Sequence, residues 1–251
     1  MRLSFHRTIA FIFLCLIAFA VTNFACGEAV WLESPPKTEA TRKVVYITFD
    51  DGPHTRTTEL LQVLAEENVL ATFFLVGKSV DLYPEETRAI YEAGHALACH
   101  SYSHVRWALM SEEKFLQEMD AFHTALRTAL GEPVDVRVFR FPYGSNWAGG
   151  EIQRMVNSHG YLWIDWNAMN NDARNDTPSN RASMLKQAMY SSVGKDEIVL
   201  LLHEGKSGTI AILPELLAFY RARGYEFDVL TPELDHLIHG VNMGLPDGRM
   251  Q

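Results

Sequence analysis

The chain has 251 residues, of which 47% are hydrophobic and 21% are charged, a balance that is typical of a globular protein and excludes a disordered one. Its net charge of -9 at pH 7 argues against nucleic acid as a partner, because nucleic-acid binding depends on clustered Lys and Arg. Three cysteines are too few for a disulfide framework, so the core must stabilise the fold.

The N-terminal segment has the features of an export signal. A basic start precedes an apolar stretch at 8–21, and small residues at 18–20 offer a cleavage site. We expect residues 1–26 to be a signal peptide or an uncleaved anchor, with Cys26 as an alternative site of lipid attachment. The body would then be exported, whether secreted, wall-associated or anchored outside, and would meet a membrane only through this segment. The polar stretch at 27–42, which contains a Pro pair, predicts a linker.

Short apolar runs alternate with amphipathic stretches through the rest of the chain, which predicts an α/β fold with parallel strands. The clearest helix is expected at 111–130, between the capping residue Ser111 and the terminating Gly131. Seven strands favour a distorted (β/α) barrel over an open sheet, in a domain at 43–240 that is followed by a tail at 241–251. The predicted strands are 44–49, 71–76, 95–99, 136–140, 161–165, 197–202 and 225–229.

Polar residues that can bind metal or transfer protons follow five of these strands. In a parallel barrel all the carboxyl ends lie on one face, where loops build active sites, so we expect these residues to meet. They are Asp50 and Asp51 after the first strand, His100 and His104 after the third, Arg140 and Tyr143 after the fourth, Asp165 and Trp166 at the end of the fifth, and His203 after the sixth.

His100 and His104 are four residues apart, a spacing that puts two imidazoles on one side of a helical turn. Such a pair alone is more often structural than metal-binding. Together with a carboxylate from another strand end, however, two histidines form a ligand set that is known for catalytic zinc and leaves a position for water.

Asp50 and Asp51 are adjacent carboxylates that repel each other unless a cation lies nearby. If one of them binds a divalent metal, the other can stay ionised and accept a proton from water. Arg140 lies in an apolar strand end and needs a partner, for which one of these aspartates is suited. After it, Pro142 stiffens a turn that can aim the N–H of Tyr143 at a developing oxyanion.

His203 could serve as a general acid if a carboxylate holds it, because that partner sets its tautomer and its pKa. Asp165 is the candidate partner, since it ends a predicted strand. Tryptophans near the strand ends can stack on sugar rings or cover the barrel mouth. They are Trp107, Trp147, Trp163 and Trp166.

Five blocks together resemble the polysaccharide deacetylase family, which is carbohydrate esterase family 4 and is also called NodB-like. The resemblance spans about 43–235 and implies a distorted (β/α) barrel that removes N- or O-acetyl groups from sugar polymers with a divalent metal, usually zinc, with Co²⁺, Ni²⁺ or Mn²⁺ as alternatives. The blocks are "TFDDGP" (48–53), "HSYSH" (100–104), "RFPYG" (140–144), "IDWN" (164–167) and "LLLH" (200–203).

The resemblance also implies a role for each metal-binding and basic position. Asp50 matches the catalytic base, and Asp51 matches the metal-binding carboxylate. His100 and His104 match the two other metal ligands, and Arg140 matches the residue that orients the base.

The remaining positions match the oxyanion donor, the acid and the pocket walls. Tyr143 matches the residue whose N–H serves the oxyanion, and His203 matches the general acid. Asp165 resembles the carboxylate that tethers this acid, while Trp166 and Leu201 fit the walls of the acetyl and sugar pocket.

One departure concerns the fourth block. Many relatives have a second Asp-Trp pair a few residues later, where this chain has Asp172-Ala173. Either Asp165 or Asp172 could therefore tether His203, and the pocket could lack an aromatic wall. We favour Asp165 because it directly ends the strand.

The expected substrate is an acetylated polysaccharide or oligosaccharide. N-acetylglucosamine of peptidoglycan is the first choice, chitooligosaccharide the second and an O-acetylated polymer the third. A catalytically inactive sugar-binding relative and a metal phosphoesterase are the alternatives from other classes.

Overall fold

The computed structural model describes residues 42–108 and 110–237. The predicted signal or anchor at 1–26, all but the last residue of the linker at 27–42, and the tail at 241–251 lie outside these ranges. The strands are β1 (Val44–Asp50), β2 (Thr72–Leu75), β3 (Ala96–Cys99), β4 (Val138–Phe139), β5 (Leu162–Trp163), β6 (Ala168–Met169), β7 (Glu197–His203) and β8 (Glu226–Asp228).

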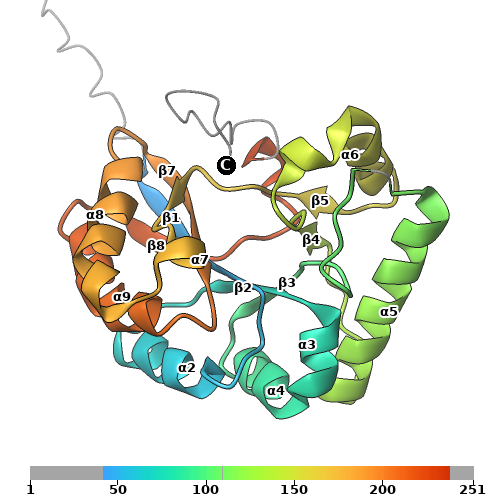
Figure 1. The fold of residues 1–251 in the computed structure, drawn as a ribbon, viewed down its shortest axis with the longest axis horizontal. Coiled ribbons are helices and arrows are strands. Elements are labelled where there is room, and N and C mark those ends of the chain that lie inside the picture. The colour runs from blue at the N-terminus through green and yellow to red at the C-terminus, as the bar shows by residue number, and fades with distance from the viewer. Residues whose placement is uncertain (1–41, 109, 238–251) are drawn as a thin grey trace, which may run out of the picture. The chain divides into compact units, whose positions relative to one another are not determined.

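Helices fill the segments between most of these strands and cover the outside of the sheet (Figure 1). None of the helices in the described ranges is long and apolar enough to cross a membrane. The helices are α2 (Thr57–Glu66), α3 (Gly77–Leu82), α4 (Pro84–Glu92), α5 (Glu112–Leu130), α6 (Gly149–Ser158), α7 (Asp172–Asn175), α8 (Arg181–Ser191) and α9 (Ser207–Arg221), with short 3₁₀ turns η1 (Ser145–Trp147), η2 (Pro178–Asn180) and η3 (Asp235–Leu237).

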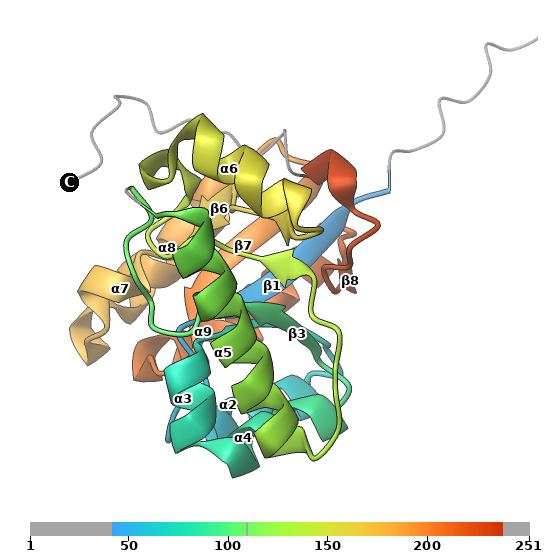
Figure 2. The same ribbon diagram turned by 90° about the vertical axis from the view of Figure 1, so that its right-hand side faces the viewer.

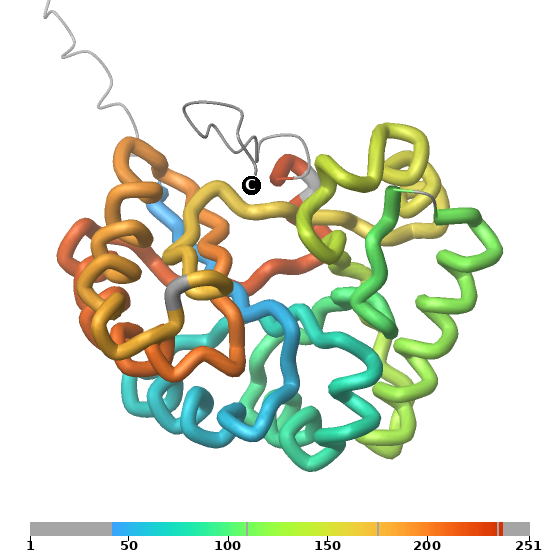
Figure 3. Tube along the Cα trace, viewed as in Figure 1, coloured from blue at the N-terminus to red at the C-terminus, as the bar shows by residue number. Residues whose placement is uncertain are grey.

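The strands form one curled parallel sheet in the order β5-β4-β3-β2-β1-β7-β6. β8 pairs with the first half of β1, at Val44–Tyr46, and β2 pairs with the second half, at Thr48–Asp50. The path through the sheet ends at β5 and β6, so the curl forms a half-barrel, which the trace in Figure 3 follows. The predicted distorted barrel of about seven parallel strands is confirmed, and each predicted strand overlaps an observed one. The two-residue strand β6 is an addition.

The two faces of the sheet bury different sets of apolar side chains. Alternate residues of β1 point to opposite faces, because the side-chain period of a strand is two. Val45, Ile47 and Phe49 belong to the large core beneath the helices, whereas Val44 and Tyr46 belong to a smaller core inside the curl. Burial on both faces explains why the strands are continuous apolar runs.

Helix α5 packs along the outside of the curl (Figure 2), and it begins and ends where the sequence predicts. The Ser111 side chain accepts a hydrogen bond of 3.2 Å from the N–H of Lys114 and caps the helix start. Gly131 ends the helix with a φ of 79°, in the left-handed region. Buried Phe115 and Phe122 attach α5 to the core.

The strand pairing determines which polar residues meet at the carboxyl edge. Asp50 of β1 stands opposite His203 of β7 in the parallel register. Cys99 of β3 pairs with Phe139 of β4, so the residues that follow them, His100 and Arg140, are neighbours as well. The prediction that polar residues from separate strand ends converge is confirmed for these segments.

Candidate active site

Asp50 is a buried carboxylate at the end of β1, and Arg140 holds it in place. Its Oδ1 accepts a hydrogen bond of 2.7 Å from Arg140 Nη1. The guanidinium is fully buried and also donates to Thr48 Oγ1 at 2.8 Å and to the carbonyl oxygens of Ile164 at 3.0 Å and Asp165 at 2.9 Å. Because so many contacts fix the guanidinium, it holds the Asp50 carboxylate in one orientation. The predicted pairing of Arg140 with one of the two aspartates is confirmed.

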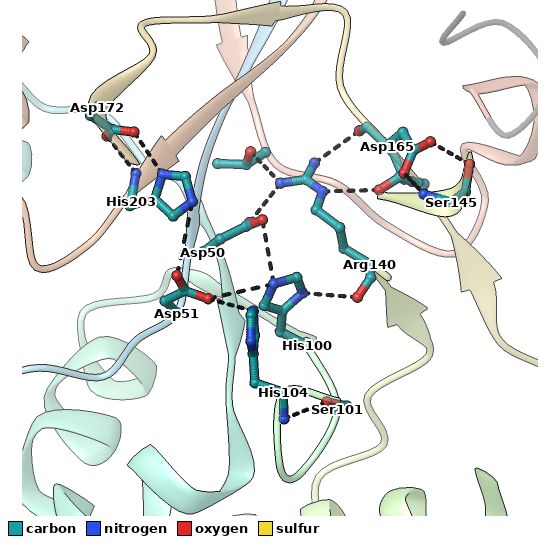
Figure 4. Close-up of polar contacts among 12 residues, drawn as sticks. Asp50, Asp51, His100, Ser101, His104, Arg140, Ser145, Asp165, Asp172 and His203 are labelled. Carbon is teal, nitrogen blue, oxygen red and sulfur yellow. Dashed lines mark hydrogen bonds and ion pairs between the residues drawn. The ribbon is translucent and has the colours of Figure 1, made fainter. Parts of the chain in front are cut away.

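Asp51, His100 and His104 bring one carboxylate oxygen and two ring nitrogens within 4.8 Å of one another (Figure 4). Asp51 Oδ1 lies 3.1 Å from His104 Nε2 and 3.6 Å from His100 Nε2. Burial raises the pKa of Asp51, but the hydrogen bond with His104 and the charges of His100 and His203 hold it well below its ordinary value. Two imidazoles and an ionised carboxylate fit zinc and related divalent metals.

A second contact orients His100 toward this cluster. Its Nδ1 lies 2.8 Å from the carbonyl oxygen of Arg140, which can only accept, so Nδ1 carries the proton. Nε2 then has a free lone pair, on the side of the ring that faces Asp51. Burial lowers the pKa of His100 despite the opposing charges of Asp50 and Asp51, so the ring is neutral at pH 7, as a metal ligand must be.

The backbone adopts the left-handed region at four non-glycine residues of the site. The φ angles are 71° at Asp51, 65° at Ser101, 54° at His104 and 69° at Tyr143. Non-glycine residues rarely take this conformation, and those that do cluster at functional sites. Ser101 Oγ accepts a hydrogen bond of 2.9 Å from the N–H of His104 and stabilises the turn between the two histidines.

Asp172, and not Asp165, is the carboxylate that holds His203. His203 Nδ1 lies 2.6 Å from Asp172 Oδ1, and the backbone N–H of His203 donates to Asp172 Oδ2 at 2.8 Å. Thr209 Oγ1 donates to the same Oδ2 at 2.7 Å. Burial lowers the pKa of His203, but the hydrogen bond and charge of Asp172, with further carboxylates nearby, outweigh burial and raise it to about 9.

The expectation for Asp165 is wrong because of the order of the strands. Asp165 follows β5 at one end of the sheet, whereas His203 ends β7 near the other end. Asp172 follows β6, which pairs directly with β7. The Asp165 carboxylate instead accepts hydrogen bonds from Ser145, at 3.1 Å from its N–H and 2.5 Å from its Oγ (Figure 4). Asp165 therefore braces the turn after β4, and its carbonyl supports Arg140.

Tyr143 lies beside the candidate metal site, while Trp166 and Leu201 lie at other positions around the edge of the sheet. The Tyr143 ring meets the His104 ring edge-on at a centroid distance of 4.8 Å. The Trp166 ring packs over Gly144, where an added Cβ would lie 3.1 Å from it. Leu201 is two residues before His203 in β7, so both side chains are on the same face of the strand.

The tryptophans near the strand ends separate into core and surface residues. Trp107 is completely buried and packs edge-on against Phe115, Phe139 and Phe141 at centroid distances of 5.3 to 5.8 Å. It is therefore a core residue. Trp147 is 44% exposed and faces solvent.

Glu204 is a buried carboxyl group that the sequence interpretation missed. It accepts a hydrogen bond from the Thr57 hydroxyl, and its N–H donates to the carbonyl of Asp50 at 3.1 Å. Among the residues that the structure describes, its other carboxyl oxygen has no hydrogen-bond partner, and it lies so close to Gly52 that a Cβ there would overlap it at 1.4 Å. Burial raises the pKa of Glu204 to about 7. A carboxylate directly after His203, at the end of an apolar strand, was the signal available in the sequence.

Comparison with known proteins agrees with this geometry. Residues 37–164 match the polysaccharide deacetylase family. A peptidoglycan-N-acetylglucosamine deacetylase of Bacillus cereus is 31% identical over 195 residues, which cover 76% of this chain and 71% of that protein. A bifunctional xylanase/deacetylase of Pseudobutyrivibrio xylanivorans is 33% identical over 80% of this chain, which matches only 32% of that longer protein.

Solved structures show the same architecture. A polysaccharide deacetylase from Bacillus cereus superposes with a TM-score of 0.69 at 28% identity, over 76% of this chain and 94% of that one. A carbohydrate esterase family 4 enzyme from Streptococcus mutans gives a TM-score of 0.68 at 36% identity, over 76% of this chain and 87% of that one. With these matches and the site described above, the chain belongs to the polysaccharide deacetylase family, carbohydrate esterase family 4.

Proposed function

We propose that this protein is a metal-dependent hydrolase that removes N-acetyl groups from a cell-envelope polysaccharide and releases acetate. N-acetylglucosamine of peptidoglycan is the substrate we favour. The observation that carries the proposal is the register of β1 and β7, which places Asp50 opposite His203 beside the cluster of Asp51, His100 and His104. A proton acceptor and a proton donor thus adjoin a set of metal ligands, as amide hydrolysis requires.

Asp51, His100 and His104 would hold the metal, with zinc as first choice and Co²⁺, Ni²⁺ or Mn²⁺ as alternatives. When bound, a divalent metal polarises the acetyl carbonyl and lowers the pKa of water. The hydrogen bond from His100 Nδ1 to the Arg140 carbonyl keeps that ligand in its orientation.

Asp50 is the general base in this mechanism. Its Oδ2 is 3.7 Å from His100 Nε2, so it can accept a proton from water that attacks next to the metal-binding cluster. Arg140 fixes the carboxylate through Oδ1 and leaves Oδ2 for this task. The N–H of Tyr143 donates to the oxyanion that develops on the acetyl group.

His203 is the general acid. Its pKa of about 9 keeps it protonated at neutral pH. Asp172 binds Nδ1, and Nε2 faces Asp51 at 3.9 Å, so Nε2 carries the transferable proton into the site. Protonation of the departing amine nitrogen completes hydrolysis and yields acetate and a free amino sugar.

The choice of substrate and location rests on the relatives and on the N-terminal segment. Relatives include peptidoglycan-N-acetylglucosamine deacetylases of Bacillus cereus and a chitooligosaccharide deacetylase of Azorhizobium caulinodans. The export-like segment at 1–26 favours a polymer outside the cytoplasm, and hence peptidoglycan over chitooligosaccharide, with O-acetylated polymers third. The protein would be secreted, wall-associated or anchored on the outer side.

Acetate release from peptidoglycan, chitooligosaccharides and acetylated xylan tests the proposal and ranks the substrates. We expect release to stop with a chelator and to return with Zn²⁺. Asp50→Asn should lower kcat by about 10²–10⁴-fold while the variant still binds metal, because the ligands remain. Glycan binding without turnover would support the inactive sugar-binding alternative. Near-normal activity of Asp50→Asn would refute the mechanism.

A further inference from the structure

Arg106, Tyr143 and Trp147 form an exposed group beside the catalytic site, which we call the Arg106 shelf. The Arg106 guanidinium lies 4.6 Å from the centre of the Tyr143 ring and 5.7 Å from that of Trp147. The two aromatic residues are 46% and 44% exposed, which is unusual for side chains of this size. The shelf thus combines a cation with two rings that solvent or a ligand can reach.

The shelf borders the metal-binding cluster because of the sheet order. β3 and β4 are neighbours, so the loop with Arg106 lies next to the turn with Tyr143 and Trp147. The Tyr143 ring contacts both groups, because it meets the His104 ring edge-on at a centroid distance of 4.8 Å and has the Arg106 guanidinium 4.6 Å from its centre. A polymer whose acetylated sugar reaches the cluster would pass over the shelf with an adjacent sugar.

The loop that carries Arg106 is anchored to the core, while the guanidinium of Arg106 is exposed. The next residue, Trp107, is completely buried among core aromatics and anchors the loop. Among the described residues, the Arg106 guanidinium has no ion pair or hydrogen bond, whereas Arg140 pairs with Asp50. A guanidinium that lies against two rings and has its N–H groups free suits a carboxylate, which it can bind through two parallel hydrogen bonds.

We propose that the Arg106 shelf is a subsite for a sugar that carries a carboxylate and adjoins the sugar that loses its acetyl group. The inference rests on the proposed function. The ring of Trp147 would pack against the apolar face of the sugar, and Arg106 would bind its carboxylate. Two sources offer this chemistry, namely the lactyl ether of N-acetylmuramic acid in peptidoglycan and a uronic acid in an acetylated plant or exopolysaccharide.

The test compares kcat/KM on N-acetylated oligosaccharides of equal length with and without a carboxylate. The neutral substrate is a chitooligosaccharide, and the acidic ones contain either alternating N-acetylmuramic acid or glucuronic acid. We expect the acidic-to-neutral ratio of kcat/KM to exceed one and to fall roughly 10- to 100-fold in Arg106→Gln, since a hydrogen-bonded charge pair is lost. The better acidic substrate identifies the source of the carboxylate.

Arg181→Gln is the matched control, because Arg181 is an exposed arginine on α8, outside the site, and its loss changes the net charge equally. The control should keep the wild-type ratio. An equal fall in both variants would show a general charge effect and overturn the inference, as would an unchanged ratio in Arg106→Gln.

Binding measurements separate failure of the subsite from failure of the proposed function. In an Asp50→Asn background, calorimetry with the acidic oligosaccharide should show a roughly 10- to 100-fold weaker Kd when Arg106→Gln is added. If no substrate releases acetate, the proposed function fails, and this arm still decides the subsite. If acetate is released and Arg106→Gln changes neither Kd nor the ratio, only the subsite is refuted.

Discussion

At the scale of single residues, three groups of the proposed mechanism are each oriented by a neighbour to which it assigns no reacting role. Arg140 fixes Asp50, its carbonyl orients His100, and Asp172 holds His203. A charged group buried without a partner is costly, so these pairings stabilise the site as well as orient it. Substitution of a supporting residue should therefore change the orientation or the pKa of the group that it holds.

Asp172→Asn should lower kcat and move the alkaline limb of the pH profile to lower pH. The raised pKa of His203 depends on the hydrogen bond with Asp172 and on the charge of this carboxylate, and Asn lacks that charge, so His203 stays protonated over a narrower range in the variant. The measurement is kcat against pH for both proteins. Asp165→Asn is the comparison, and an equal shift of the alkaline limb in that variant would contradict the assignment of Asp172.

Glu204→Gln should change how stability depends on pH. The pKa of Glu204 is about 7 in the folded protein against 4.5 ordinarily, so the folded state retains a proton that the unfolded state loses between these values. The stabilisation from this proton is complete below pH 4.5 and is lost as pH rises through 7. The wild type should therefore lose on the order of 3 kcal/mol of unfolding free energy relative to Glu204→Gln across this window.

Denaturant unfolding of both proteins at several pH values between 4 and 8 measures this difference, because other titrating groups contribute to both and cancel. A constant difference across the window would refute the raised pKa. Gln retains the size of the side chain and can still accept the hydrogen bond from the Thr57 hydroxyl, so we expect the variant to fold.

At the scale of elements, the signals that predicted α5 also predict its sensitivity. Ser111→Ala removes the cap and should lower the unfolding free energy by about 1 kcal/mol. Gly131→Ala forces a Cβ into the left-handed region and should lower it by about 1–2 kcal/mol. Each kcal/mol corresponds to a Tm about 2–4 °C lower for a domain of this size. Thermal unfolding of the two variants measures these changes. An unchanged Tm in Gly131→Ala would contradict the claim that a Cβ strains the backbone at this position.

Elements that lie in a periodic or apolar stretch could be predicted from the sequence, while β6 could not. Helix α5 has a cap, an apolar stripe and a terminating glycine, and β1 is a seven-residue apolar run. β6 has only two residues and, unlike the equally short β4 and β5, lies between polar residues, Asn167 and Asn170, so no apolar run indicates it. Because β6 delivers Asp172 to His203, its absence from the prediction led directly to the wrong tether.

Polar residues at strand ends could be located from the sequence because parallel strands place their carboxyl ends on one face. Their individual pairings depend on the order of strands in the sheet, which hydrophobic patterns do not encode. The placement of β5 and β7 far apart is a tertiary result of this kind. Glu204 was missed for a related reason, since its burial beneath the β1 turn depends on the pairing of β1 with β7.

At the scale of the whole molecule, the candidate metal site joins loops that follow different strands. Asp51 follows β1, whereas His100 and His104 follow β3, which is separated from β1 by β2. A ligand that binds only the folded state adds to its stability. Metal binding should therefore stabilise the domain as a unit.

Zn²⁺ at about 100 times its Kd should add about 2.7 kcal/mol and raise the Tm by about 5–10 °C. His104→Asn should lose most of this rise, since it removes a ligand while Asn tolerates the left-handed backbone at this position. Asp50→Asn should keep the rise in Tm, because it leaves all three metal ligands in place. Scanning calorimetry with and without Zn²⁺ measures the rise, and an equal rise in His104→Asn would refute this metal site.

The left-handed backbone at Asp51 and His104 has a consequence for which residues can serve as ligands there. In an extended strand, neighbouring side chains point to opposite faces, and a φ of 71° lets Asp51 depart from this alternation and share a site with Asp50. Among non-glycine residues, Asn, Asp and His tolerate this conformation best, and Asp and His also bind metal through a short side chain. The conformation of the loop and the chemistry of the metal therefore select the same two residue types, so a substitution such as Asp51→Glu would keep the ligand atom and still fail to suit the turn.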